Sequence, residues 1–98
     1  MPYGYVIAQI TVKDAETYPR YVAMVQPTIE HFGGEFIVRG GKSVSHEGTP
    51  PGDRNVVIRF PSYEKAEAWY HSDIYAEAKA LRQSASTSVQ TIVEGVEK

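Results

Sequence analysis

The chain of 98 residues is 42% hydrophobic and 22% charged, values typical of a globular protein, and we expect residues 1–98 to form a single domain. Ten basic residues against twelve acidic ones give a formal net charge of −2 without the basic stripe typical of nucleic-acid binding, and the absence of cysteine excludes disulfides and cysteine-based metal sites. Because the N-terminus lacks the pattern of a signal peptide and no apolar run approaches the roughly 18 residues of a membrane helix, we expect a cytoplasmic protein with no membrane partner.

Residues 3–12 are predicted to form the first strand, because apolar residues occupy alternate positions. One face is apolar and is expected to join the core: Val6, Ala8, Ile10 and Val12. The opposite face is half apolar and contains Tyr5, Ile7, Gln9 and Thr11. A strand with two apolar faces is unusual in a sheet that is covered on one side only.

An amphipathic helix is predicted to follow, either capped by Asp14 or with its main part beginning at Pro19. Its apolar stripe repeats at spacings of three and four and consists of Tyr18, Tyr21, Val22, Val25, Ile29 and Phe32. Pro27 cannot donate a backbone hydrogen bond, so we expect a bend or an early end there. The pair Gly33–Gly34 is expected to close the helix, because glycine readily takes the left-handed conformation.

The rest of the chain contains three more predicted strands and two helical pieces. The strands are residues 35–39, 55–60 and 88–96, with residues 42–47 as a further polar edge strand or hairpin arm and a turn-rich loop at 48–53. The helical pieces are expected to begin after Ser62 and Ser72, which can cap them, and to be separated at His71–Asp73.

The order β-α-β-β-α-β predicts an α+β fold, the ferredoxin-like split βαβ sandwich, in which helices cover one face of a four-stranded antiparallel sheet. The uncovered face would include Tyr5, Ile7 and Gln9, one of the two alternating sets around Ile37 and Arg39, and either Val57 with Arg59 or Val56 with Ile58. An apolar surface of this size exceeds what a monomer usually exposes. We therefore expect a homodimer in which two sheets pack face to face.

Four segments resemble one known family, and together they span nearly the whole chain: "GYVIAQITV", "GGEFIVRGG", "VVIRFPSYEKAEAWYHSDIYAEAKALR" and "TIVEGV". The resemblance is to the domain of unknown function 1330 family, which is grouped with the dimeric α+β barrels. Relatives in that group include cofactor-free monooxygenases, muconolactone isomerase-like enzymes, chlorite dismutase and haem-degrading proteins. The resemblance implies a dimer with a pocket between sheet and helices. The family has no settled activity, so it assigns no catalytic residue.

Arg39 is the sharpest candidate for ligand binding. Its guanidinium stands at the end of a predicted strand beside Gly40–Gly41, where a carboxylate or enolate could approach the backbone closely. The alternative is a salt bridge to Glu47 across the neighbouring hairpin arm, with the glycine pair forming a bulge. Of the two arginines that bracket the next strand, Arg54 and Arg59, a charge within the apolar run makes Arg59 the more interesting.

Five further residues are candidate ligand contacts: Tyr5, Tyr21, Trp69, Tyr75 and Arg82. Tyr5 and Tyr21 serve in this interpretation either as cavity residues or as dimer contacts. The helical spacing of Trp69 favours a place in the core between helix and sheet. Arg82 shares a helix face with Tyr75 and borders either a pocket mouth or solvent.

A candidate acid–base pair is formed by His71 and Asp73, which lie close together at the predicted helix break. Ser72 between them is better explained as a helix cap than as a nucleophile. The remaining histidines, His31 and His46, fit no known metal motif, and we expect neither a metal nor a cofactor.

Two hypotheses for function remain open. The first is a small-molecule-binding protein that acts as a cofactor-independent, monooxygenase- or isomerase-like enzyme on a small aromatic or enolisable carboxylate. The ring-rich composition and the arginines favour it. The alternative is a non-catalytic dimeric binding or structural protein, favoured by the lack of a recognisable catalytic constellation. The sequence does not decide whether the protein is an enzyme.

Overall fold

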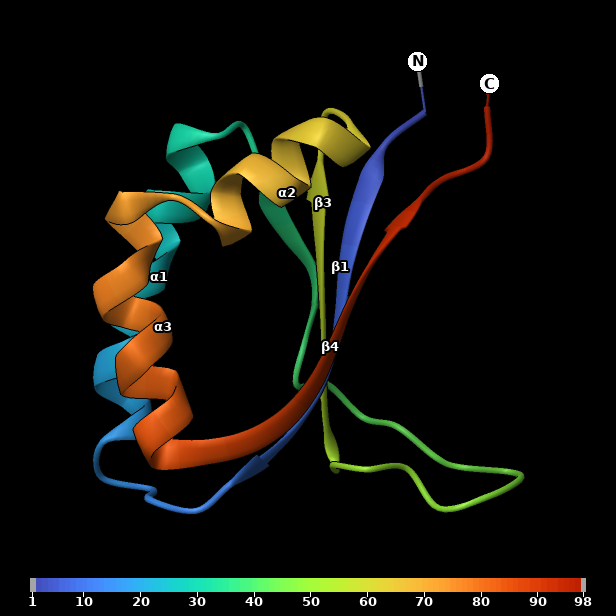
Figure 1. Cartoon of the computed structure of the whole chain (residues 1–98). Coiled ribbons are helices and arrows are strands. Elements are labelled where there is room, and N and C mark those ends of the chain that lie inside the picture. Colours follow the sequence, from blue (N-terminus) through green and yellow to red (C-terminus); the bar gives the residue numbers. More distant parts are fainter. Residues whose placement is uncertain (1, 98) are drawn as a thin grey trace.

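The computed structural model describes residues 2–97, which form one four-stranded sheet with three helices on one side of it (Figure 1). The elements in chain order are β1 (Gly4–Val12), α1 (Tyr18–His31), β2 (Glu35–Arg39), β3 (Arg54–Phe60), α2 (Tyr63–Tyr70), α3 (Asp73–Ala85) and β4 (Ser86–Glu94). All strand pairs are antiparallel and the strand order is β2-β3-β1-β4. The predicted α+β, ferredoxin-like architecture is confirmed. Within residues 2–97, no helix has the length and apolar character needed to cross a membrane.

The core lies between the helices and the sheet face turned toward them, here called the inner face. The first and third strands contribute alternate residues to it, as their apolar periodicity predicted: Val6, Ala8 and Ile10 from β1, and Val56, Ile58 and Phe60 from β3. The helices contribute large side chains, namely Val25 and Ile29 from α1, Trp69 from α2 and Tyr75 from α3. Val12, predicted to be in the core, lies at the strand end and is exposed.

Helix α1 begins at Tyr18 and not at Asp14, so the alternative start near Pro19 describes it better. The Asp14 carboxylate instead stabilises the preceding turn. It accepts the N–H groups of Glu16 and Thr17, both at 3.1 Å, and the Thr17 hydroxyl at 2.6 Å. The hydrogen bond from the Thr17 side chain is the main reason why the pKa of Asp14 is lowered.

Pro27 does not end helix α1, and the predicted early end there is wrong. Val25 and Ile29 are buried on either side of Pro27, and this burial holds the helix together where one backbone hydrogen bond is missing. The helix ends as predicted at the glycine pair. Gly33 has a φ of +77°, its N–H donates to Glu30 O at 3.0 Å, and the N–H of Gly34 donates to Ile29 O at 2.9 Å.

The break between α2 and α3 lies where the sequence predicted it. The Ser62 hydroxyl accepts the N–H of Lys65 at 3.1 Å and caps α2, and the Ser72 hydroxyl accepts the N–H of Tyr75 at 3.3 Å and caps α3. The Ser72 hydroxyl also donates to Trp69 O at 2.7 Å, so one side chain joins the end of α2 to the start of α3.

Residues 42–47 are not a strand, which corrects the prediction of an edge strand or hairpin arm. They belong to an exposed loop between β2 and β3 that extends away from the sheet (Figure 1). The hydrogen bond from Gly40 N–H to Asn55 O at 2.8 Å still joins the chain to β3 after β2 ends, and the loop returns to the sheet at Pro51, whose carbonyl accepts the Thr11 hydroxyl at 3.4 Å. The polar residues that follow have no apolar face to bury, and Pro50–Pro51 cannot donate to a neighbouring strand.

A β-bulge in β2 changes which residues face the helices. Phe36 pairs with Ile58, Val38 with Val57 and Arg39 with Val56, so Ile37 is an extra residue in the strand. Simple alternation would place Phe36 and Arg39 on opposite faces, but the bulge places both on the inner face. It lies three residues before the glycine pair at which the sequence suggested a bulge.

The opposite side of the sheet, here called the outer face, is uncovered in the single chain. Ile7, Val38 and Val89 are 41%, 41% and 51% exposed. For β3 the structure decides between the two predicted sets: Val57 and Arg59 lie on the outer face, opposite Ile7 and Tyr5 of β1. Arg59 forms an ion pair with Glu35 of β2 on this face. The charge inside an apolar strand therefore points away from the core.

Candidate functional site

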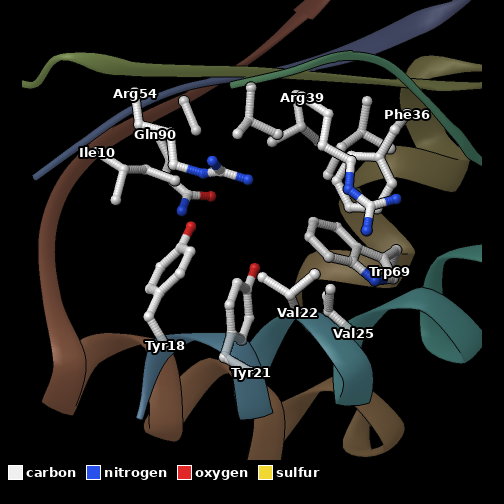
Figure 2. Close-up of a pocket in the computed structure, with 14 residues that line it drawn as sticks. Ile10, Tyr18, Tyr21, Val22, Val25, Phe36, Arg39, Arg54, Trp69 and Gln90 are labelled. Carbon is white, nitrogen blue, oxygen red and sulfur yellow. The ribbon is translucent and has the colours of Figure 1, made fainter. Parts of the chain in front are cut away.

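A narrow cavity lies between α1 and the inner face of the sheet, with Trp69 of α2 at one end (Figure 2). Most of its walls are aliphatic or aromatic. The residues that bring polar groups to it are Tyr18, Tyr21, Arg39, Arg54 and Gln90. The cavity has a free volume of about 20 Å³, little more than one water molecule needs. A ring-sized ligand therefore enters only when side chains of the cavity, such as that of Arg39, move aside.

Arg54 is the residue whose surroundings suggest a ligand most directly. It is the first residue of β3 and pairs with Ile10, so its side chain lies on the inner face. The guanidinium carbon is 5.5 Å from the centre of the Tyr18 ring. Its Nε is buried and has no hydrogen-bond partner among residues 2–97. A buried donor without an acceptor is costly, and an anion in the cavity would supply the acceptor.

Gly40 makes the position of Arg54 possible. Gly40 has a φ of +72°, and a Cβ on it would collide with Nη1 of Arg54 and lie 2.8 Å from its Cζ. Gly41, its neighbour, has no atom within 4 Å of the corresponding position. Of the second glycine pair, Gly40 is therefore the one that the cavity requires, since it provides both the turn after β2 and the space for the Arg54 guanidinium.

Arg39 lies at the mouth of the cavity, where the bulge in β2 directs it. Its guanidinium carbon is 4.8 Å from the centre of the Phe36 ring, and its Nη1 donates to Gln26 Oε1 of α1 at 3.3 Å. The alternative salt bridge to Glu47 does not form, because Glu47 lies in the exposed loop. Arg39 thus connects the edge of the sheet to α1 across the opening, held by the face of the Phe36 ring and by a hydrogen bond to a neutral amide.

Two phenols point into the cavity from α1. The hydroxyl groups of Tyr18 and Tyr21 are directed toward Arg54 and Gln90 (Figure 2), and the two rings are 5.4 Å apart. Burial raises the pKa of Tyr21 well above its usual range, and the neighbouring Tyr75 phenol adds to this effect. Tyr21 therefore remains a neutral O–H group, able to donate to a bound anion.

Trp69 is both a core residue and part of the cavity wall. Its ring lies 4.0 Å from that of Tyr75 and 5.4 Å from that of Phe60, centre to centre. Its Nε1 donates to Thr28 Oγ1 at 3.0 Å, and the Thr28 hydroxyl donates to Val25 O at 2.7 Å. This buried chain fixes the indole plane, so the wall that a ligand would meet is rigid.

The predicted ligand contacts fall into three groups. Arg39, Tyr21 and Trp69 line the cavity together. Tyr75 is buried beside Trp69, and Arg82 lies in a neighbouring hollow between α3 and β4. Tyr5 is on the outer face, where it pairs with Arg59 and Val93, and does not line the cavity. Tyr5 faces outward because side chains alternate along β1, and Val6 and Ala8 occupy the positions that face inward.

The candidate acid–base pair is not brought together. The His71 side chain is 70% exposed, and its Nε2 lies 3.2 Å from Glu67 Oε2. Asp73 is exposed in the first turn of α3. Neither residue lines the cavity described above. Among residues 2–97, no three histidine, aspartate or glutamate side chains gather closely enough to hold a metal ion.

The sequence interpretation missed Arg54, Tyr18 and Gln90 as cavity residues and chose Arg59 over Arg54. A signal for Arg54 was present, because it is in phase with Val56, which lies two residues later on the inner face. Gln90 follows the same rule, since it pairs with Ala8 of β1.

Solved structures share this fold at low sequence identity. A protein of unknown function from Rhodopseudomonas palustris, RPA0582, has a TM-score of 0.78 and 18% identity over 99% of this chain and 85% of its own. SnoaB, a cofactor-independent oxygenase from Streptomyces nogalater, has a TM-score of 0.67 and 11% identity over 100% and 97%. A candidate antibiotic biosynthesis monooxygenase from Caulobacter crescentus has a TM-score of 0.57 and 16% identity over 98% and 92%. These likenesses establish the fold.

No match was found among curated proteins. The family of this chain is shown instead by a family model that matches its sequence. The family model described as a domain of unknown function, DUF1330, matches residues 3–96, which is almost the entire chain. The resemblance that the glycine pairs and the Trp69-containing helix suggested is thereby confirmed, and the chain belongs to the DUF1330 family.

Proposed function

We propose that this protein binds a small aromatic or enolisable carboxylate between α1 and the sheet and acts on it as a cofactor-independent, monooxygenase- or isomerase-like enzyme. The observation that carries the proposal is the Arg54 guanidinium, which faces the cavity with its buried Nε unpartnered. Aromatic rings beside it, among them Tyr18 and Trp69, suit a flat apolar body. The fold that it shares with SnoaB, described as a cofactor-independent oxygenase, is consistent with such an activity.

The lining determines what chemistry the cavity can support. It supplies one cation deep in the cavity, Arg54, a second at the mouth, Arg39, and the neutral phenol of Tyr21. No carboxylate or imidazole is among the described residues that line it. The groups present stabilise a bound anion, so they favour the enolate form of an enolisable substrate, with water as the acceptor of its proton.

Replacing Arg54 by glutamine is expected to weaken benzoate binding about tenfold or more, because a charge-assisted hydrogen bond is lost. Isothermal titration calorimetry with benzoate measures the change, and neutral benzamide serves as the ligand control. Arg20→Gln is the matched protein control, since Arg20 is exposed on α1 and does not line the cavity. The proposal would be contradicted if Arg54→Gln and Arg20→Gln lost the same benzoate affinity. It would also be contradicted if the wild type bound benzamide as tightly as benzoate.

Turnover is tested separately from binding. Oxygen consumption or enol–keto exchange is measured with aromatic enolisable acids that bind the wild type. If the protein is an enzyme, the wild type shows a measurable rate of one of these reactions, and this rate is lower in the Arg54→Gln variant. Tight binding with no rate for any such compound would support the alternative, a binding protein without catalysis.

We also propose that two copies pack outer face to outer face, which would cover the exposed apolar residues of this side. The patch includes Ile7, Val38 and Val89, and the ion pair between Arg59 and Glu35 lies within it. Such a patch with an internal charge pair can bury its apolar part without leaving an isolated charge.

Ile7→Glu is expected to convert the dimer to a monomer, because each copy would bury one carboxylate without a cation opposite it. Sedimentation velocity at micromolar protein concentration measures the change. Val44→Glu is the control, since Val44 is 75% exposed in the loop after β2. A wild type that sediments as a monomer at this concentration would overturn the dimer.

A further inference from the structure

Arg82 is a buried arginine without an acidic partner. It is 3% exposed, and no carboxylate of residues 2–97 forms an ion pair with it. Its Nε donates to the Tyr75 hydroxyl at 3.3 Å, and its Nη1 donates to the Ser88 hydroxyl at 2.8 Å. Gln90 accepts from the same two nitrogens, at 3.2 and 3.1 Å, when its amide oxygen is turned toward them. All three partners are neutral.

A charged group in this position is unusual. Arginine stays protonated at every accessible pH, and buried charges in proteins are normally paired with an opposite charge. The hydroxyl and amide groups orient the guanidinium, and the C-terminal end of α3, in whose last turn Arg82 lies, offsets part of its charge. No carboxylate of residues 2–97 adds to this. Arg82 is therefore a buried, oriented cation suited to pairing with an oxyanion.

A hollow beside Arg82 has room for that anion. It lies between α3 and β4, has a volume of about 220 Å³ and is lined by Tyr70, Arg82, Gln83, Ser86, Ser88 and Gln90. Lys79 adds a second cation near it, with Nζ 4.5 Å from the centre of the Tyr70 ring. The hydroxyls, the two amides and the Arg82 guanidinium of the lining suit a carboxylate or a similar oxyanion, whereas the cavity under Arg54 is mostly apolar.

The hollow and the cavity are neighbours on the inner face. Gln90 lines both. Arg54 pairs with Ile10, and Ile10 pairs with Ser88 on the other side, so Arg54 and the Arg82 partner Ser88 lie in one row across the sheet. Two strand spacings separate their backbones by about 10 Å. Arg82 reaches this row from α3 through its hydrogen bond to Ser88 at 2.8 Å, so the spacing of the row is comparable to the length of an aromatic ring with acidic groups on opposite sides.

We propose that the hollow is a second anion subsite and that the ligand carries two acidic groups, one bound by Arg54 and the other by Arg82. The substrate class is then an aromatic dianion, such as a ring with carboxylates on opposite sides, with Gln90 between the two subsites. This inference rests on the proposed binding of a carboxylate at Arg54, and its test is chosen to fail separately from that one.

The test compares benzoate with terephthalate, which differs only by a second carboxylate, and with 4-carbamoylbenzoate, whose second group is neutral. Calorimetry on the wild type is expected to show terephthalate binding at least about tenfold more tightly than either monoanion, because it adds a charge-assisted contact. If all three bind equally, the second subsite is overturned and the proposed function stands. If Arg54→Gln leaves benzoate binding unchanged, the proposed function itself fails.

Gln83→Glu is the deciding variant. Gln83 is an exposed rim residue, so the chain keeps its fold, and the new carboxylate compensates Arg82 from within the hollow. The ratio of terephthalate to benzoate affinity is expected to fall to about one. Ser84→Glu is the matched control, because it adds the same charge at the next exposed position, outside the lining. The second subsite is overturned if the ratio of terephthalate to benzoate affinity is unchanged in Gln83→Glu. It is also overturned if this ratio falls equally in Ser84→Glu.

Discussion

Trp69→Ala is expected to destabilise the fold by about 3–5 kcal/mol, the usual cost of truncating a buried large aromatic residue. The indole is 1% exposed and packs on Phe60 and Tyr75. Its loss also leaves the Thr28 hydroxyl without the N–H that it accepts. Since small domains are stable by only about 5–15 kcal/mol, this variant retains a small margin at best.

Urea unfolding followed by circular dichroism measures this loss. Trp69→Phe keeps a ring in place but removes the N–H donor, so it is expected to fall between the wild type and Trp69→Ala. Ile74→Ala is the surface control, because Ile74 is 47% exposed on α3, and it should change stability by less than about 0.5 kcal/mol. A cost for Trp69→Ala no larger than for Ile74→Ala would mean that the helices do not pack on the sheet around this residue.

Gly40→Ala is expected to act on both stability and binding. A side chain at a φ of +72° costs about 1–2 kcal/mol from backbone strain. The new methyl group also occupies the place of the Arg54 guanidinium, which must move. Benzoate affinity should therefore fall to that of Arg54→Gln, although the variant retains every polar group of the cavity.

Gly41→Ala is a matched control for this prediction, since a Cβ there meets nothing within 4 Å and no positive φ is found at Gly41. It should bind benzoate like the wild type. Benzoate binding is measured by calorimetry, and stability by urea unfolding, on the wild type, Gly40→Ala and Gly41→Ala. If Gly40→Ala binds normally despite its strain, Arg54 does not hold the ligand in the place that the structure gives it.

The fold was predictable because its signals are local. Alternation in β1 and β3, the stripe of α1 and the caps Ser62 and Ser72 each depend on residues a few positions apart. The segment 42–47 is a loop although the sequence predicts a strand there, because its polarity is also typical of a solvent-exposed edge strand. It has no partner strand to pair with, and short polar sequence cannot distinguish the two cases.

The site was less predictable because its geometry depends on contacts between distant residues. The bulge at Ile37 arises from pairing with β3, and it turns Arg39 inward against the alternation that the sequence implies. The collision that reserves position 40 for glycine involves Arg54, fourteen residues later. The glycine pair stands out in the sequence, but its explanation, the contact of Gly40 with Arg54, depends on how β2 and β3 lie in the folded sheet.

The chain contains one tryptophan, and it forms part of the cavity wall. Its indole emission therefore originates at the surface that a ligand would touch, with the Phe36–Arg39 pair and Tyr21 also in that lining. Occupancy can be followed by the intrinsic fluorescence of the native protein, without a label. The same signal would report the rate at which the narrow cavity opens, because quenching can begin only after the side chains have moved aside.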